Sequence, residues 1–139
     1  MNVLVIDIGG TNIKVASSEI RVPIKIPSGP QLTAKRMVED VLNATKGWNY
    51  DCVTLGYPGP VNHDAPIMEP HNLAPGWIDF PYAKAFKKPH RFINDAAMQA
   101  LGSYKKGKML FLGLGTGLGS TLILDGISMI RVWPEARTL

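Results

Sequence analysis

The chain of 139 residues is long enough for one domain, or for one domain and the start of a second. Hydrophobic residues make up 45% and charged residues 19%, which excludes a disordered tail and allows a buried core. The net charge of +4 is spread along the chain and its densest run, Lys105-Lys106-Gly107-Lys108, is short, so we expect a solvated surface and no nucleic-acid partner.

The single cysteine, Cys52, cannot form an internal disulfide, and its position in an apolar run favours a place in the core. The histidines, His63, His71 and His90, stand in separate predicted loops, so no cluster of Cys and His has metal-ligand spacing. The N-terminal apolar run ends at Asp7 after four residues, which is too short for a signal peptide or a membrane span. We expect a cytoplasmic protein without a membrane partner.

Three strands are predicted at the start of the chain. Residues 3–7 form an apolar run rich in β-branched side chains, which is typical of a buried strand. Strand character resumes over residues 13–16 after a glycine turn, and apolar and polar residues then alternate over residues 20–26. The pattern predicts an antiparallel meander whose third strand has its apolar side chains on one face.

A helix, a strand and a long loop are predicted next. Apolar side chains recur at helical spacing over residues 34–42, which predicts a helix. Thr33 stands just before it and can cap its first turn. Residues 52–55 have the pattern of a buried strand. Residues 56–81 are rich in Pro, Gly and Asn, and a loop of this length in a compact domain usually serves a function.

The rest of the chain repeats the pattern of its start. A short strand is predicted over residues 91–93 and a helix over residues 96–104. A second strand–turn–strand follows, with strands over residues 109–112 and 120–124 joined by a glycine-rich turn. Two similar openings predict a duplicated architecture of which the second copy is only begun.

The first candidate site is the segment Asp7-Ile8-Gly9-Gly10-Thr11-Asn12, in which an acidic residue ends a buried strand and two glycines allow a close turn. Such a turn can present backbone N–H groups to a phosphate, and Asp7 can hold Mg²⁺ directly or through water. A plain glycine hairpin turn is the alternative, and the local residues do not decide between the two.

The second candidate site is the segment Gly113-Leu114-Gly115-Thr116-Gly117-Leu118-Gly119-Ser120. Its alternating glycines suit a loop that surrounds an anion with backbone N–H groups. It lacks the Gly-Lys-Ser/Thr of a Walker loop, and a strand follows where a dinucleotide-binding turn has a helix. Together with the first segment it indicates phosphate binding.

The third candidate is Asp95 in the segment Ile93-Asn94-Asp95-Ala96-Ala97, where a strand ends and a helix begins. An aspartate is a favoured helix cap and needs no further role there. The functional alternative is a carboxylate that accepts a proton from an attacking hydroxyl group, with Asn94 orienting the alcohol.

Five motifs together resemble a known family. In chain order they are Asp7-Ile-Gly-Gly-Thr, Gly56-Tyr-Pro-Gly59, His71-Asn72-Leu73 with Trp77 nearby, Asn94-Asp95-Ala96 and Leu114-Gly-Thr-Gly-Leu-Gly119. The chain resembles the ROK family of sugar kinases and related repressors, and within it is most similar to bacterial glucokinases and polyphosphate glucokinases. The resemblance covers residues 3 to about 126.

The resemblance implies the α/β, actin-like (ribonuclease H-like) fold, in which two domains flank a cleft. Residues 1–106 would form the N-terminal lobe with the sugar site, and residues 107–139 would begin the C-terminal lobe. Trp77 is not carried over as a site residue, because an aromatic side chain in a loop is more often a packing anchor.

The resemblance also implies the roles of individual residues in the sugar site. Asp95 would be the catalytic base and would contact the sugar. Asn94 and Asn72 would be further sugar ligands, and Gly59 would shape the floor of the pocket.

For the donor side, the resemblance implies that Asp7 organises Mg²⁺. The transferred phosphoryl group would meet Gly9, Gly10, Thr11 and Asn12, and the donor phosphates would meet Gly115, Thr116 and Gly117. The implied reaction transfers a phosphoryl group from ATP or polyphosphate to a hexose, with O6 of glucose as the expected acceptor.

The chain departs from the family pattern after Gly126. The family continues with a Glu-x-Gly-His segment that binds the sugar, but here Glu135 is followed by Ala136 and Arg137, so that role is not carried onto Glu135. The cysteine-rich zinc segment of many members and most of the second domain are also missing from the sequence. We therefore expect a truncated chain that has the acceptor half of the site without the donor half.

Two alternatives stand beside a kinase. One is a non-catalytic sugar- or phosphate-binding lobe that forms homodimers through the apolar side chains of residues 127–133. The other is an actin-like nucleotidase, which suits the two phosphate turns but leaves Asn72 and Asn94-Asp95 unexplained. The identity of the hexose, whether glucose, mannose or an N-acetylated hexosamine, stays open.

Overall fold

The computed structural model describes residues 1–114, 118–125 and 127–129. The chain divides into two compact units, Met1–Asp95 and Ala96–Leu139. Among the described residues, no helix is both long enough and apolar enough to cross a membrane.

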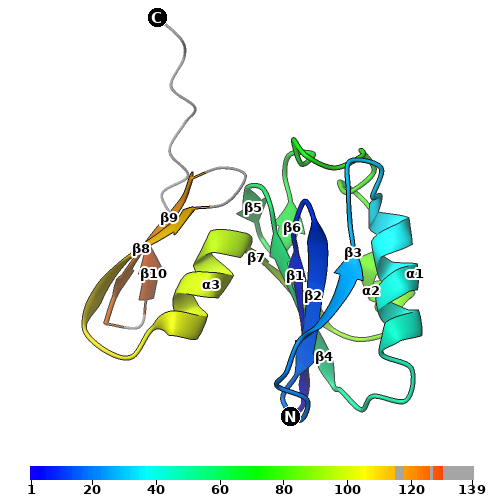
Figure 1. Ribbon diagram of the computed structural model, residues 1–139, viewed down its shortest axis with the longest axis horizontal. Coiled ribbons are helices and arrows are strands. Elements are labelled where there is room, and N and C mark those ends of the chain that lie inside the picture. The colour runs from blue at the N-terminus through cyan, green and yellow to red at the C-terminus, as the bar shows by residue number, and fades with distance from the viewer. Residues whose placement is uncertain (115–117, 126, 130–139) are drawn as a thin grey trace, which may run out of the picture. The chain divides into compact units, whose positions relative to one another are not determined.

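A five-stranded mixed sheet forms the centre of the first unit (Figure 1). In spatial order its strands are β3 (Ile24–Pro27), β2 (Asn12–Ser17), β1 (Val3–Ile8), β4 (Cys52–Tyr57) and β7 (His90–Asn94). The strands β1, β2 and β3 form the predicted antiparallel meander, whereas β4 is parallel to β1 and β7 is parallel to β4. Since β1, β4 and β7 run in the same direction, their carboxyl ends meet at one edge of the sheet.

The third strand is shorter than the alternating pattern predicts, because it begins at Ile24 and not at residue 20. The preceding residues leave the sheet where Ser17 closes a turn. Its N–H donates to the Ile20 carbonyl oxygen at 2.9 Å, and its hydroxyl oxygen accepts from the Ile20 N–H at 3.0 Å. Ile20 and Val22 are consequently exposed, so the predicted common face holds for Ile24 and Ile26 alone among these four side chains.

The hydrophobic core of the first unit lies between one face of the sheet and two helices, α1 (Ala34–Ala44) and α2 (Tyr82–Phe86), which Figure 1 shows on the same side. Alternate strand residues face this core, as the burial of every second residue of β1 shows. The buried side chains of β1 are Leu4, Ile6 and Ile8, and those of the helices are Ala34, Met37, Val38, Val41, Tyr82 and Phe86. Full burial of one such large apolar side chain contributes about 1.5–3 kcal/mol.

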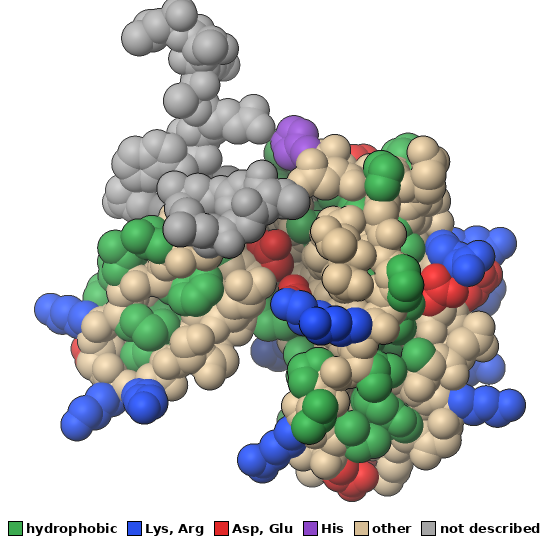
Figure 2. Space-filling view, viewed as in Figure 1, with side chains coloured by type: hydrophobic (Ala, Val, Ile, Leu, Met, Phe, Trp, Pro, Cys, Tyr) green, Lys and Arg blue, Asp and Glu red, His purple; other side chains and the backbone are tan. Residues whose placement is uncertain are grey.

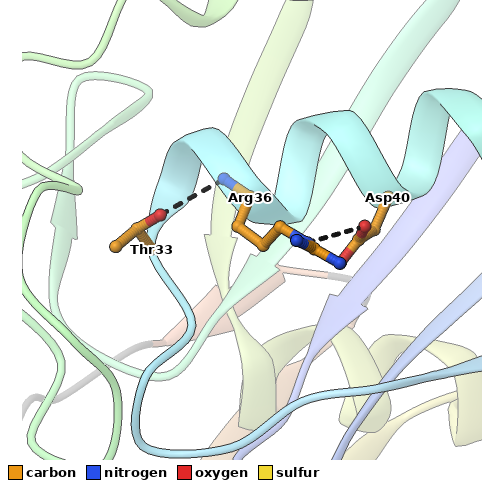
Figure 3. Close-up of polar contacts among 3 residues, drawn as sticks. All are labelled: Thr33, Arg36 and Asp40. Carbon is orange, nitrogen blue, oxygen red and sulfur yellow. Dashed lines mark hydrogen bonds and ion pairs between the residues drawn. The ribbon is translucent and has the colours of Figure 1, made fainter.

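The helix α1 begins where the sequence predicts. Thr33 caps it, because its Oγ1 accepts a hydrogen bond from the Arg36 N–H at 3.2 Å (Figure 3). One turn later, Nε of Arg36 lies 2.9 Å from both carboxylate oxygens of Asp40 in an exposed i,i+4 pair. Leu42, predicted on the buried face, lies at the edge of the apolar stripe and is exposed.

The stretch predicted as one long loop is partly regular. It contains a small hairpin of β5 (Val61–Asn62) and β6 (Ala65–Pro66). Both residues of its turn, His63 and Asp64, have positive φ angles of 48° and 59°, as the tight turns of two-residue hairpins require. The helix α2 was not predicted, because five residues are too few for helical periodicity to be visible.

The helix α3 (Asp95–Ser103) begins at the boundary of the two units. The second unit contains a three-stranded antiparallel sheet in the order β10 (Ile127–Met129), β9 (Leu118–Leu124), β8 (Lys108–Leu114). Antiparallel pairing of β8 with β9 confirms the two predicted strands. The predicted lobes, residues 1–106 and 107–139, stay a prediction.

Replacing Thr33 by alanine tests the cap of α1. We expect Thr33→Ala to lower the free energy of unfolding by about 1 kcal/mol, because the Arg36 N–H loses its acceptor. Urea denaturation followed by circular dichroism measures this difference. Thr33→Ser, which keeps the hydroxyl group, is the control and should retain the stability of the wild type. An alanine variant as stable as the serine variant would contradict the capping role.

Candidate functional site

The parallel strands of the first unit gather the candidate residues at one edge of the sheet. The strands β1, β4 and β7 end at the upper edge in Figure 1. Asp7 and the glycine turn lie at the end of β1, Gly59 follows β4, and Asn94 is the last residue of β7. Ligands of open α/β sheets bind at the carboxyl ends of parallel strands. This edge is therefore the candidate site.

The glycine turn between β1 and β2 is a tight hairpin. The Gly9 N–H donates to the Asn12 carbonyl oxygen at 3.1 Å, and a Cβ atom on Gly9 would lie 2.7 Å from that same oxygen, so the position requires glycine. Ser28, at the end of β3, fastens the turn: its hydroxyl group donates to the Gly9 carbonyl oxygen at 2.7 Å, and its N–H donates to the Thr11 carbonyl oxygen at 2.9 Å. Sequence reasoning did not assign this role to Ser28.

Asp7 lies opposite Lys14 in the β1–β2 ladder, and its Oδ2 is 3.9 Å from Nζ of Lys14. Burial raises the pKa of the Asp7 carboxyl group, and the Lys14 ammonium group opposes part of this rise. Ionisable groups with shifted pKa values cluster at functional sites. Lys14 was missed from the sequence, because an exposed lysine on a strand has no distinguishing pattern.

The metal-binding capacity of this edge is modest. Across the residues that the structure describes, no three His, Cys, Asp or Glu side chains gather into a possible metal cluster. Asp7 is therefore not part of such a cluster among the described residues. Mg²⁺ commonly takes one or two protein carboxylates and completes its coordination with water and substrate phosphates. A lone Asp7 fits this role for an ion that arrives together with a phosphorylated ligand.

Asn72 lies against the glycine turn, although the two are far apart in the sequence. A Cβ atom built on Gly10 would lie 3.8 Å from Cβ of Asn72. The loop around Asn72 is anchored to the body of the unit, because the Ala74 N–H donates to the Leu32 carbonyl oxygen at 3.1 Å and the Leu73 side chain is buried. The structure thus brings two of the sequence-predicted segments together.

Gly59 and Asn94 are joined directly. The Asn94 Nδ2 donates to the Gly59 carbonyl oxygen at 3.2 Å, and Asn94 is the ladder partner of Tyr57. A Cβ atom on Gly59 would lie 2.8 Å from Cε1 of the Tyr57 ring. Gly59 therefore allows the chain to pass close over a buried aromatic ring while its carbonyl group holds the Asn94 amide.

Trp77 is a packing residue, as the sequence predicts. Its side chain is fully buried, its Nε1 donates to the Ala74 carbonyl oxygen at 2.8 Å, and its ring centroid lies 5.8 Å from that of Tyr57. The hydroxyl group of Tyr82 donates to the Trp77 carbonyl oxygen at 2.9 Å. Burial raises the pKa of both the Tyr57 and the Tyr82 phenol.

Asp95 is the first residue of α3 and follows Asn94 directly. Its side chain is partly buried. A carboxylate in the first turn is stabilised by the helix dipole, so the helix-start interpretation fits this position. The same position sets the carboxylate beside Asn94 at the end of β7, and the interpretation as a base therefore stays open as well.

The second glycine segment spans the end of β8 and the start of β9. Its flanking residues pair as Gly113 with Gly119 and Leu114 with Leu118, and a strand follows the turn as predicted. Gly115, Thr116 and Gly117, the residues expected to meet the donor phosphates, lie outside the described residues.

A cavity of about 260 Å³ lies elsewhere in the first unit. It is lined by Asp64, Ala65, Pro66, Asp79, Phe80, Pro81, Tyr82, Ala83 and His90. His90 begins β7, so the cavity lies near the amino end of that strand, and its lining includes none of the described candidate residues.

Basic side chains are dispersed over the face of the molecule shown in Figure 2. This dispersal agrees with the scattered Lys and Arg residues of the sequence. Proteins that bind nucleic acids usually gather such charges into a patch or stripe. The expected absence of a nucleic-acid partner stays a prediction.

Comparison with known proteins gives a consistent result. A model of the ROK family matches residues 3–130. The chain is similar to the ROK hexokinase from Thermus thermophilus, with 26% identity, a TM-score of 0.72, and coverage of 93% of this chain and 49% of that chain. It is also similar to a ROK family protein from Streptococcus pneumoniae solved in complex with sucrose, with 24% identity, a TM-score of 0.70, and coverage of 93% and 48% respectively.

A third similar structure is the glucokinase from Parabacteroides distasonis, with 21% identity, a TM-score of 0.59, and coverage of 90% of this chain and 44% of that chain. No curated protein sequence matches the chain. The chain spans about half the length of the solved structures that it matches. These matches confirm the predicted fold class, an α/β lobe of the actin-like (ribonuclease H-like) type.

Gly59→Ala tests the close approach of this residue to Tyr57. The added Cβ would overlap a fully buried ring whose hydroxyl group donates to the Met68 carbonyl oxygen, so we expect a loss of about 1–3 kcal/mol in the free energy of unfolding. Gly102→Ala in α3 is the control, because nothing lies within 4 Å of its added Cβ and alanine is the better helix former. Urea denaturation compares the two, and equal stability of both variants would contradict the packing argument.

Asp7→Asn tests the desolvation of Asp7. Because burial raises the folded-state pKa above the unfolded value of about 4, the ionised side chain lowers stability at higher pH. We expect Asp7→Asn to be more stable than the wild type at pH 7. The difference in free energy of unfolding between the variant and the wild type should grow as the pH rises from the unfolded pKa to the raised folded pKa of Asp7. It should vanish at pH values below both, where the carboxyl group is protonated in both states.

Urea denaturation over a pH series measures this difference, with Asp64→Asn in the exposed hairpin turn as the control for loss of one surface charge. An Asp7→Asn variant that is less stable than the wild type at pH 7 would show that the ion pair with Lys14 outweighs the desolvation.

Proposed function

The chain belongs to the ROK family, and on that ground we propose that it binds a hexose at the carboxyl ends of β1, β4 and β7 and takes part in phosphoryl transfer to it. The donor is ATP or polyphosphate, and the acceptor atom is O6 of glucose. The observation that carries the proposal is the proximity of Asn72 to Gly10 of the glycine turn. It sets an amide suited to a sugar hydroxyl beside a turn suited to a phosphate.

The similar structures support a sugar as the ligand class. Two of them are, by their names, a hexokinase and a glucokinase, and a third was solved with sucrose. We propose a cytoplasmic location, because ATP and polyphosphate, the proposed donors, are found there.

On the acceptor side, Asp95 is the proposed base. The sugar hydroxyl oxygen attacks the terminal phosphorus, its proton passes to the Asp95 carboxylate, and the bond from phosphorus to the bridging oxygen of the donor breaks. Asn94, whose amide is held by the Gly59 carbonyl group, orients the alcohol. Such transfer depends mainly on positioning and charge stabilisation, so one base in a rigid site is a sufficient protein contribution.

On the donor side, the glycine turn meets the transferred phosphoryl group. The Gly9 N–H is engaged by the Asn12 carbonyl oxygen, so Gly9 shapes the turn and the N–H groups of Gly10 and Thr11 are the proposed phosphate donors. Mg²⁺ bound with the donor would neutralise charge on its phosphates, with Asp7 as the protein ligand. The segment from Gly115 to Gly117 is the proposed contact for the remaining donor phosphates.

A feature of the second unit favours another function, a binding lobe that self-associates without catalysis. Leu110 and Leu112 alternate along β8, and Leu110 lies opposite Leu122 of β9, so the three share one face of the sheet. All three side chains are exposed. Leucines gathered on one face suit a protein partner, including a second copy of the chain.

Asp95→Asn removes the proposed proton acceptor and keeps a side chain of nearly the same size at the start of α3. We expect phosphorylation of glucose by the 139-residue chain, measured in a coupled assay with ATP or polyphosphate, to fall by about 10²–10⁴-fold. The unfolding transition should stay close to that of the wild type.

Asp64→Asn is the matched control, since it makes the same chemical change in an exposed turn. Turnover by Asp95→Asn at the wild-type rate would exclude Asp95 as the base. A wild-type chain that binds glucose in calorimetry without turning it over would favour the binding lobe, and a chain that does neither would overturn the proposed function.

A further inference from the structure

Glu69 closes the loop that carries Asn72. Its carboxylate oxygens accept hydrogen bonds from three consecutive backbone N–H groups: Gly76 at 3.1 Å, Trp77 at 3.1 and 3.3 Å, and Ile78 at 3.3 Å. Hydrogen bonds to an ionised acceptor are roughly twice as strong as those between neutral groups. One half-buried carboxylate therefore ties both ends of the segment from 69 to 78 together.

Other hydrogen bonds hold the same segment. The Tyr57 hydroxyl group donates to the carbonyl oxygen of Met68 at 2.8 Å, just before the loop begins. Inside the loop, Nε1 of the buried Trp77 donates to the Ala74 carbonyl oxygen at 2.8 Å. These bonds fix the ends of the loop while Asn72 lies between them, against the glycine turn.

The backbone geometry at the far end of the loop suits this arrangement. Gly76 has a φ angle of +105°, a conformation that other residues rarely adopt, and its N–H is the first of the three that meet the carboxylate. The ion pairs found among the described residues do not involve Glu69. Among the described residues, the carboxylate thus serves the backbone of the loop.

We propose that Glu69 is a positioning residue of the hexose site, which holds Asn72 in place by closing the loop from residue 69 to residue 78. This inference rests on the proposed function. A loop held in its binding conformation loses less entropy when a ligand binds, so loss of the Glu69 bonds should weaken hexose binding. Because Glu69 acts through Asn72 and not on the transferred group, KM for the hexose should rise with kcat little changed.

The experiment compares Glu69→Ala and Glu69→Gln with the wild type in two measurements. Calorimetry with glucose gives the hexose Kd, which we expect to rise about tenfold in Glu69→Ala and less in Glu69→Gln, which keeps one acceptor oxygen. Amide hydrogen exchange at Gly76, Trp77 and Ile78 reports the closure of the loop directly, and should become faster in both variants.

Glu39→Ala on the exposed surface of α1 is the matched control and should change neither measurement. Unchanged exchange in both Glu69 variants would overturn the closure itself.

Faster exchange with an unchanged Kd would overturn the positioning role and leave the proposed function intact, since the wild type still binds. A wild type that binds no hexose would overturn the proposed function and, with it, this inference. If Glu69→Ala does not fold, Glu69→Gln makes the same comparison.

Discussion

The pairing register of β1, β4 and β7 is the constraint on which the candidate site depends. In this register Asp7 lies beside Gly56, and Tyr57 lies beside Asn94, so the residues that leave the sheet after each strand start from neighbouring positions. Successive side chains of a strand face opposite sides of the sheet. A slip of one residue in β4 would therefore move Leu55 out of the core. The packing of the core against α1 and α2 thus decides where the loops of the site begin.

Polar side chains hold those loops in place through hydrogen bonds to backbone groups. Ser28 binds carbonyl groups of the glycine turn, Tyr57 binds the carbonyl group of Met68, and Glu69 binds the N–H groups of the segment that follows. Backbone groups that leave a sheet need partners when water cannot reach them. The side chains that supply these partners also set the shape of the edge at which Asn72 and Asn94 lie.

Much of the fold could be predicted from the sequence, because hydrophobic periodicity is a local signal. It predicted the antiparallel meander, α1 and the strands β4 and β7, but not that β4 and β7 pair in parallel, and Thr33 was visible as a cap. It failed where a local hydrogen bond overrode the pattern, as at Ser17, and where an element was too short to show a period, as in α2.

Those residues of the candidate site that form local motifs could be predicted from the sequence. The roles of these residues stay predictions. Lys14, Ser28 and Glu69 could not be found in this way, because each acts on a partner that the fold brings near. A lone glutamate in a loop gives no sign that three backbone N–H groups will meet it. The proximity of Asn72 to Gly10 could not be predicted for the same reason, since neither residue indicates the other in the sequence.

The burial of Trp77, a residue of the loop itself, has a kinetic consequence. Ordering a free chain costs roughly 1–2 kcal/mol of backbone entropy per residue. In this loop the burial of Trp77 offsets that cost during folding, before any ligand binds. A ligand that reaches Asn72 then encounters a loop whose shape is already set. Association at this edge would be limited by diffusional encounter and orientation, and its rate should follow ligand concentration linearly, without the plateau that a slow loop rearrangement produces.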